Sequence, residues 1–265
     1  MDFKLLKVIS LLLDYPDDAL FDGEHLHACR EIVMKSVLIS PEVRQEIAEF
    51  IDELASLGNI DAQSRYDGLF ERGRNLSLWL FEHVHGESRD RGQAMVDLMA
   101  QYEAAGFEIG VKELPDYLPM YLEFLAYQAT QTDDDIAIRL EIADIKHILI
   151  LLAARLADKN SHYVCLFKAL LQIAGQPLSV IDDELSKMGK VIDDTTPAAI
   201  DAEWEEEVVN FMANNDEQCP SSQTAKRISE LAGANAQNMQ TQPVHWVGFN
   251  QNNTTNPTNA KGVNV

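Results

Sequence analysis

The segment of the chain richest in reactive side chains is residues 81–92, which reads FEHVHGESRDRG. It combines two histidines, three acids and two arginines, namely Glu82, His83, His85, Glu87, Arg89, Asp90 and Arg91. Side chains of these types can ligate a metal ion or transfer protons. A metal-dependent hydrolase centred on His83 and His85 is therefore the first hypothesis that these residues raise.

The spacing of the two histidines argues against a shared metal ion. The apolar residues before them follow a helical period, and positions i and i+2 of a helix point about 200° apart. The chain has no glycine-rich phosphate loop and no nucleophile elbow, and its three cysteines, Cys29, Cys165 and Cys219, form no CxxC pair. The sequence thus predicts no catalytic residue, no metal site and no bound cofactor.

Two other interpretations account for the same segment. It can be a connection between two helices, in which Arg89 and Arg91 pair with nearby acids. It can also be part of a peptide-recognition surface. The residue types alone leave these interpretations open.

A second unusual segment is residues 113–125, which reads ELPDYLPMYLEFL. Its prolines indicate the entry to a helix, with Asp116 as the capping residue and Pro119 in the first turn. Tyr121, Phe124 and Leu125 then give that helix aromatic and aliphatic faces.

Helices must position both segments, because apolar residues recur at spacings of three and four along most of the chain. Ser40-Pro41 is a typical helix start, and the acids 133–135 suit the first turn of another helix. We expect helices over residues 3–13, 41–57, 76–84, 93–105, 118–128, 136–157, 161–174 and 198–213. Sustained strand alternation is absent, so the predicted fold class is all-α, with eight to ten helices in one body.

The net charge of the chain limits the classes of partner that it can bind. There are 43 acidic against 21 basic residues, which gives a net charge of −22. Such a field repels nucleic acids and anionic membrane surfaces, and it favours basic partners. The apolar runs are shorter than the ~20 residues of a membrane span, and the isolated cysteines suit a reducing cytoplasm.

Composition changes near residue 214. Residues 1–213 are predicted to form the helical domain, and residues 214–265 a polar, largely disordered tail. From residue 232 onward the chain has eight asparagines and a single charged residue, Lys261, which is too polar a composition to build a core. Within it, residues 244–249 (VHWVGF) form one apolar stretch that can dock on the body or on a partner.

Three segments of the chain closely resemble the NarJ family, the assembly chaperones of respiratory nitrate reductase within the wider TorD-like group. They are residues 66–70 (YDGLF), 81–92 and 113–125. The resemblance extends from about residue 5 to residue 213. It implies an all-helical, non-catalytic chaperone in the cytoplasm that binds the apo catalytic (alpha) subunit, chiefly at its N-terminal segment. Such a chaperone holds the subunit for molybdenum cofactor insertion and before membrane docking, and it is absent from the finished enzyme.

The resemblance also implies a site for the client peptide. We expect it to involve Tyr66, Leu69, Phe70, Glu82, His83, His85, Glu87, Arg89, Asp90, Arg91, Asp116 and Tyr121. The wider group has a Glu-Pro-x-Asp-His pattern, whereas residues 113–117 here read Glu-Leu-Pro-Asp-Tyr, so a tyrosine replaces the histidine. A general helical interaction scaffold, with no preference for a basic amphipathic peptide, is the remaining alternative.

Overall fold

The computed structural model describes residues 3–85, 89–110, 113–132 and 134–189, together with residues 194, 196 and 201. For residues 85, 89 and 90 only the backbone is described. The chain divides into two units, Met1–Glu206 and Glu207–Val265, and every described residue belongs to the first. The helix predicted over 198–213, the boundary at 213 and the tail lie outside the described residues and stay predictions.

Within the described ranges the chain forms twelve α-helices, one π-helical turn and no β-strand, which confirms the all-α fold class. The elements are α1 (Lys4–Leu13), α2 (Asp18–Phe21), α3 (His25–Lys35), α4 (Pro41–Leu57), α5 (Asn59–Tyr66), η1 (Asp67–Glu71), α6 (Glu82–His85), α7 (Arg89–Ala104), α8 (Leu118–Gln131), α9 (Asp135–Asp144), α10 (Lys146–Asp158), α11 (Val164–Ile173) and α12 (Ser179–Lys187). None of these helices has the length and apolar character needed to cross a membrane.

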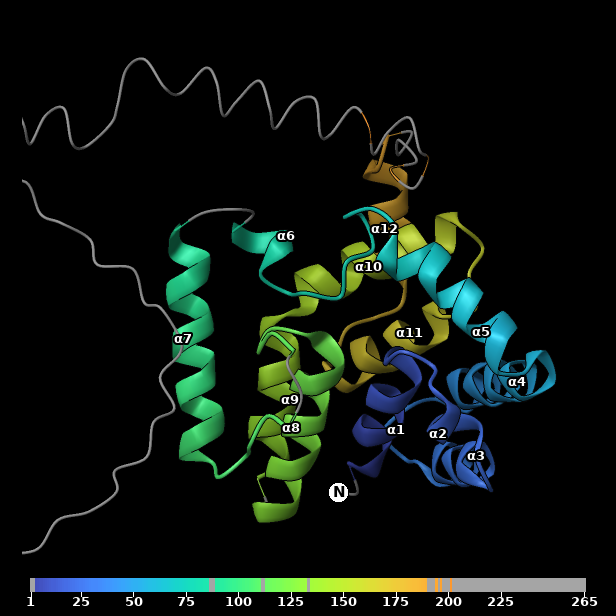
Figure 1. Ribbon diagram of the computed structural model, residues 1–265, viewed down its shortest axis with the longest axis horizontal. Coiled ribbons are helices and arrows are strands. Elements are labelled where there is room, and N and C mark those ends of the chain that lie inside the picture. Colours follow the sequence, from blue (N-terminus) through green and yellow to red (C-terminus); the bar gives the residue numbers. More distant parts are fainter. Residues whose placement is uncertain are drawn as a thin grey trace, which may run out of the picture. The chain divides into compact units, whose positions relative to one another are not determined.

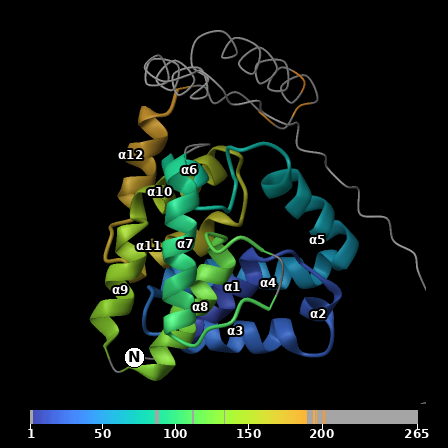
Figure 2. The same cartoon turned by 60° about the vertical axis from the view of Figure 1, so that its left-hand side comes forward.

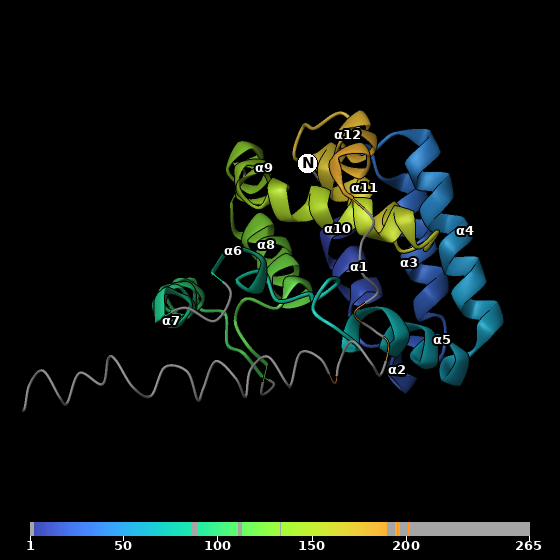
Figure 3. The ribbon, with the colours of Figure 1, turned by 90° about the horizontal axis from the view of Figure 1, so that it is seen from above.

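Helix α1 lies at the centre of the packing, with α8 on one side and α3 on the other (Figures 1 and 3). Six of its apolar side chains belong to the core: Leu5, Leu6, Val8, Ile9, Leu12 and Leu13. The buried Ser10 hydroxyl donates a hydrogen bond of 2.7 Å to the Pro119 carbonyl at the start of α8. Because α1 lies between two other helices, only a narrow stripe of its surface stays exposed.

Helix α7 lies at the edge of the described unit, beyond α8 (Figures 1 and 3), and the rotated view brings it to the front (Figure 2). It is held through Tyr102, whose ring centroid lies 4.5 Å from that of Phe124 and whose hydroxyl donates to the Pro115 carbonyl at 2.7 Å. One aromatic side chain therefore links α7 both to α8 and to the turn before it.

The predicted helix starts are confirmed where a side chain caps the first turn. The Ser40 hydroxyl accepts from the Val43 amide, and Pro41 occupies the first position of α4. Asp134 accepts from two amides at the start of α9. Pro119 lies in the first turn of α8, as expected, but the residue preceding that helix is Tyr117 and no side chain caps it.

The helix predicted over residues 76–84 is wrong. Residues 72–81 are not helical, and only Glu82–His85 form the short helix α6. Leu76, Leu78 and Leu80 are all buried, and their spacing of two is that of an extended segment with one face toward the core. Bends and turns flank the extended residues 77–79, and we call residues 72–81 as a whole the extended segment, which crosses from η1 to α6 (Figures 1 and 2).

Two further differences concern helix boundaries. The helix predicted over 136–157 is broken at Ile145 into α9 and α10, and α10 starts anew with the Ile148 amide bonded to the Ile145 carbonyl at 3.0 Å. The short helices α2 and α5 were not predicted. Neither were the two longer helices α3 and α12. Between them they bury only three side chains, Cys29, Val33 and Ile181, which leaves little apolar periodicity in the sequence.

Candidate functional site

The extended segment 72–81 pairs with the turn that precedes α8. Trp79 and Tyr117 form an antiparallel bridge, in which the Leu80 amide donates to the Asp116 carbonyl at 2.9 Å and the Leu118 amide to the Leu78 carbonyl at 2.8 Å. The Trp79 indole N–H also donates to Glu113 at 3.1 Å. This bridge joins the two segments that stood out in the sequence.

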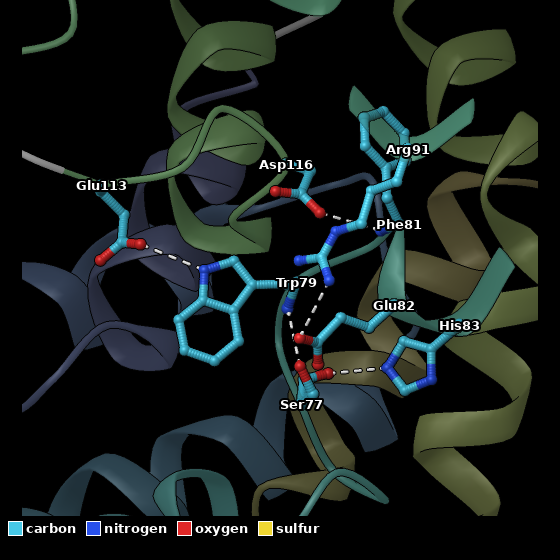
Figure 4. A network of polar contacts seen from close by, with 8 residues as sticks. All are labelled: Ser77, Trp79, Phe81, Glu82, His83, Arg91, Glu113 and Asp116. Carbon is cyan, nitrogen blue, oxygen red and sulfur yellow. Dashed lines mark hydrogen bonds and ion pairs between the residues drawn. The ribbon is translucent and has the colours of Figure 1, made fainter. Parts of the chain in front are cut away.

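Asp116 is the buried centre of this junction (Figure 4). One carboxylate oxygen accepts from the Phe81 amide at 3.0 Å, so Asp116 binds a distant segment instead of capping α8, and the predicted capping role is wrong. The other oxygen has no hydrogen-bond partner among the described residues. Burial raises the pKa of Asp116, although the Phe81 amide and the nearby Arg91 guanidinium act in the opposite direction.

The charged residues of the 81–92 segment stabilise the same junction. The Arg91 guanidinium lies between the carboxylates of Asp116 and Glu82 (Figure 4), and it pairs with Glu82 at 3.4 Å. The His83 Nε2 atom lies 2.8 Å from the Ser77 carbonyl, and burial lowers the pKa of this histidine. His83 therefore bonds to the extended segment, and no cluster of three metal-ligating side chains occurs among the described residues.

A chain of hydroxyls joins Tyr66 to Tyr117 and continues to α1. The Tyr66 hydroxyl lies 3.0 Å from both the Leu13 carbonyl and the Tyr117 hydroxyl, and the Tyr117 hydroxyl donates to Asp14 at 3.0 Å. Each phenol carries a single proton, so two protons are shared among three close contacts. The end of α1, the end of α5 and the turn before α8 are thereby tied together.

Acidic side chains gather around this junction, and we call them the acidic rim: Asp14, Asp17, Asp67, Glu71 and Glu113. Partial burial raises the pKa of Asp14, and the charges of Asp17 and Glu113 raise it further. Burial likewise raises the pKa of Glu71, with Asp67 and Glu113 contributing. Asp14 and Glu71 each lie within electrostatic range of two other acids, so negative charge is concentrated at this part of the surface.

An apolar cavity of about 400 Å³ opens next to the acidic rim, and we call it the α1–α3 hollow. Its lining comes from α1, α2, α3 and the residues between them: Lys4, Lys7, Val8, Leu11, Asp14, Tyr15, Asp17, Ala19, Leu20, His25, Ala28, Cys29 and Ile32. Two large apolar side chains remain substantially exposed there, Leu11 at 38% and Tyr15 at 43%. Tyr15 also packs edge-on against Tyr66, with ring centroids 5.5 Å apart, so the hollow contacts the motif residues.

Known proteins resemble this chain over most of its length. A family model described as "Nitrate reductase delta subunit" matches residues 38–169. The chain is 44% identical over 229 residues to the nitrate reductase molybdenum cofactor assembly chaperone NarJ of Escherichia coli (strain K12), with 86% of this chain and 93% of that protein covered. The chain belongs to this family of nitrate reductase assembly chaperones. It is therefore an assembly chaperone and not an enzyme, which confirms the resemblance inferred from its motifs.

Two further relatives are less similar to this chain. The probable assembly chaperone NarW of Escherichia coli (strain K12) is 41% identical over 230 residues, covering 86% of this chain and 93% of the relative. The probable assembly chaperone NarJ of Bacillus subtilis (strain 168) is 28% identical over 163 residues, covering 62% of this chain and 84% of that protein.

The structure brings some of the predicted site residues together at this junction, and it buries several of them. Tyr66, Phe70, Asp116 and Tyr121 have little or no exposed surface, and Tyr121 donates to Glu141 at 3.0 Å. The half-buried set comprises Leu69, Glu82, His83 and Arg91. The side chains of His85, Glu87, Arg89 and Asp90 lie outside the described part of the structure.

The apolar lining of the hollow was missed by the reasoning from sequence. One signal was present: Leu11 is an apolar residue on the face of α1 that points away from the core, and Tyr15 follows it one turn later. Asp14 and Asp17 follow the first predicted helix, and nothing local in the sequence indicates that Asp14 contacts Tyr117 or lies near Glu113.

Proposed function

We propose that this protein is a dedicated chaperone for the catalytic subunit of respiratory nitrate reductase. It binds the apo subunit in the cytoplasm, chiefly at its N-terminal segment. It holds that subunit while the molybdenum cofactor is inserted and before the subunit docks at the membrane, and it leaves before the enzyme is complete. Membership in the family of assembly chaperones supports the class of client.

One observation carries the proposal: an apolar hollow opens directly beside a cluster of carboxylates. A basic, amphipathic helix fits this combination, because its apolar face can enter the hollow while its cations meet the acidic rim. The net charge of −22 then steers such a segment toward the chaperone from a distance.

The buried motif residues have a positioning role in this proposal. Tyr117, which itself contacts Tyr66, holds Asp14, and the Trp79 indole holds Glu113. Asp116 and Arg91 fix the extended segment that carries Trp79. The motifs thus shape the rim without contacting the client themselves.

To hold the client only before cofactor insertion, the chaperone must bind the apo subunit more tightly than the mature subunit. A segment that is accessible in the apo subunit and packed away in the mature one binds the chaperone only in the first state. The chaperone then needs no catalytic group to time its release.

Titration calorimetry with a synthetic peptide tests the proposal. The probe is roughly the first 20 residues of the catalytic subunit from the same organism, a length that exceeds three helical turns. Wild type should bind it saturably, and Leu11→Gln should weaken binding by roughly tenfold, because a half-exposed leucine loses about 1.4 kcal/mol of apolar contact.

Two controls complete this experiment. Val37→Gln removes an apolar side chain that is 81% exposed and lies outside the hollow, and it should leave the affinity unchanged. A scrambled peptide of the same composition distinguishes a dedicated chaperone from a general helical scaffold, which would bind both peptides equally. Absence of saturable heat with the native peptide would count against the proposed function.

A further inference from the structure

We infer that the α1–α3 hollow fixes the direction of its client, which lies antiparallel to α1 with its free amino terminus between Asp14 and Asp17. This inference rests on the proposed function, because it takes the amphipathic N-terminal segment as the occupant. It adds an orientation and a recognised chemical group, the α-ammonium of the client.

The first observation is that the two ends of the hollow differ in charge. Lys4 and Lys7 line it at the beginning of α1, where Lys7 also pairs with Glu123 of α8. Asp14 and Asp17 line it just beyond the end of the same helix. Helix α1 has ten residues and is therefore about 15 Å long, so the two ends are well separated compared with the range of a contact.

The dipole of α1 adds to this difference. The amino end of a helix carries a partial positive charge and its carboxyl end a partial negative charge. The positive end of α1 coincides with Lys4, and the negative end with Asp14. Side chains and backbone therefore polarise the hollow in the same sense.

A client N-terminal helix carries the opposite arrangement when it lies antiparallel to α1. Its α-ammonium group, with an ordinary pKa of about 7.7–8.0, is charged at neutral pH, and its own dipole is positive at that end. In the antiparallel orientation this end meets Asp14 and Asp17, whereas in the parallel orientation it meets Lys4 and Lys7. Charge complementarity selects the antiparallel one.

The two carboxylates are held in place and still have acceptor capacity. Both the Tyr15 amide and the Tyr117 hydroxyl donate to Oδ1 of Asp14, at 2.9 and 3.0 Å. Asp17 uses Oδ1 to cap α2, accepting from the Leu20 amide at 3.0 Å. Within the described structure, Oδ2 of Asp14 and Oδ2 of Asp17 can each still accept a hydrogen bond. An ammonium group can donate three.

Paramagnetic NMR of the full chain measures the orientation. The probe is the same peptide with a nitroxide on the side chain of its second residue or, in a second sample, near its other end. The first label should broaden the amides of residues 14, 15, 17 and 18 most, and the second label those of residues 4–8. The reverse pattern, or equal broadening at both ends, would overturn the inference while leaving the chaperone function intact.

Calorimetry tests the recognised group. Acetylating the peptide amino terminus should weaken binding to wild type roughly threefold, as expected for one partly exposed ion pair. Against the double variant Asp14→Asn/Asp17→Asn, which keeps both acceptors and the α2 cap, acetylation should have no effect. The matched control, Asp61→Asn/Asp183→Asn, changes two exposed acids outside the hollow and should respond as wild type does.

Each negative result has a distinct meaning. If the free peptide gives no saturable heat, the proposed function fails and this inference fails with it. If the free peptide binds but acetylation costs nothing in wild type, or costs the same in the Asp14/Asp17 double variant, the recognition of the α-ammonium group is wrong and the chaperone function stands.

Discussion

Tyr117 is the residue at which the motif segments of this protein meet. Its ring lies 6.1 Å from that of Trp79, and its hydroxyl contacts Tyr66 and Asp14. The wider TorD-like group is similar here but has a histidine, which can gain a proton near neutral pH. Burial raises the pKa of Tyr117 far above its ordinary value, so this position stays neutral and keeps its proton for Asp14.

Removing the Tyr117 hydroxyl should loosen the acidic rim. We expect Tyr117→Phe to lower the free energy of unfolding by about 1 kcal/mol, because two hydrogen-bonded contacts are lost while the ring stays packed. Urea unfolding measures this change. Tyr127→Phe removes the hydroxyl of a half-buried tyrosine on α8 and serves as the control; an equal loss in both variants would contradict a special role for Tyr117.

Asp116 should make stability depend on pH in a direction unusual for a carboxylate. Its pKa is raised in the folded state from an ordinary 3.8, so the native state holds its proton more tightly than the unfolded state. This contribution is fully favourable below the ordinary pKa and is lost as the pH rises through the raised pKa. Asp116→Asn should therefore gain stability relative to wild type as the pH rises above about 4.

Denaturant unfolding of both proteins across the acidic and neutral range checks this prediction. Titrating groups that do not interact with Asp116 cancel in the difference between wild type and variant. A difference that is flat with pH, or one that falls as the pH rises, would show that Arg91 compensates the buried charge fully.

At the residue scale, the sequence indicated the right residue but the wrong contact for Asp116. Its place before Pro119 predicts a cap, a short-range role, whereas the carboxylate accepts from the Phe81 amide, 35 positions away. Local spacing cannot show such a partner. The resemblance to a family, by contrast, indicated that residues 66–70 and 113–117 belong to one site.

At the scale of elements, the extended segment 72–81 is held by hydrogen bonds to two other parts of the chain. The Asn75 amide donates to Asp194 at 2.8 Å, and the Arg155 guanidinium donates to the Asn75 carbonyl at 2.5 Å. At Gly73 the backbone has a φ of +84°, and a Cβ there would lie 2.5 Å from the Asp194 carboxylate carbon. The segment therefore enters its extended path through a residue with no room for a side chain.

Gly73→Ala should destabilise the protein by roughly 1–3 kcal/mol, from backbone strain and from the clash with Asp194. Gly23→Ala is a matched control, because Gly23 also has a positive φ, of +62°, but a Cβ there would meet no described atom within 4 Å. Thermal unfolding of both variants separates strain from clash. If Gly23→Ala costs as much as Gly73→Ala, the contact with Asp194 contributes nothing.

The same segment shows where reasoning from sequence succeeds and where it fails. The alternation of Leu76, Leu78 and Leu80 is visible in the sequence, yet the dense apolar run over residues 76–84 predicts a helix there. The break at Ile145 has no glycine or proline to mark it, so a single helix was predicted there. Strong amphipathic helices such as α1 and α4, which bury one full face, were predicted well.

At the scale of the whole molecule, charge should control how fast the client binds more than how long it stays. Raising the salt concentration from 0.05 to 0.5 M shortens the range of the field below the ~10 Å that holds at 0.1 M. We expect the association rate to fall at least severalfold and the dissociation rate to change little, because apolar contacts in the hollow set the latter. Stopped-flow measurements with a labelled peptide give both rates; a salt effect confined to dissociation would contradict this expectation.

The polar tail should contribute little to the stability of the helical unit. We expect removal of residues 232–265 to leave the melting temperature nearly unchanged, because eight asparagines and few apolar residues cannot build a core. Differential scanning calorimetry of the shortened and full chains checks this. A large drop would show that the apolar stretch 244–249 docks on the body.

Trp79 offers an optical view of the candidate site. The chain has three tryptophans, and the other two, Trp204 and Trp246, lie outside the described residues. With those two replaced by phenylalanine, all indole fluorescence would come from Trp79, whose ring lies beside that of Tyr117 and whose N–H donates to Glu113. Any client that draws Glu113 toward its own cations would change the polarity around that single indole. The wavelength and lifetime of the Trp79 emission would then report changes at the acidic rim while the client binds.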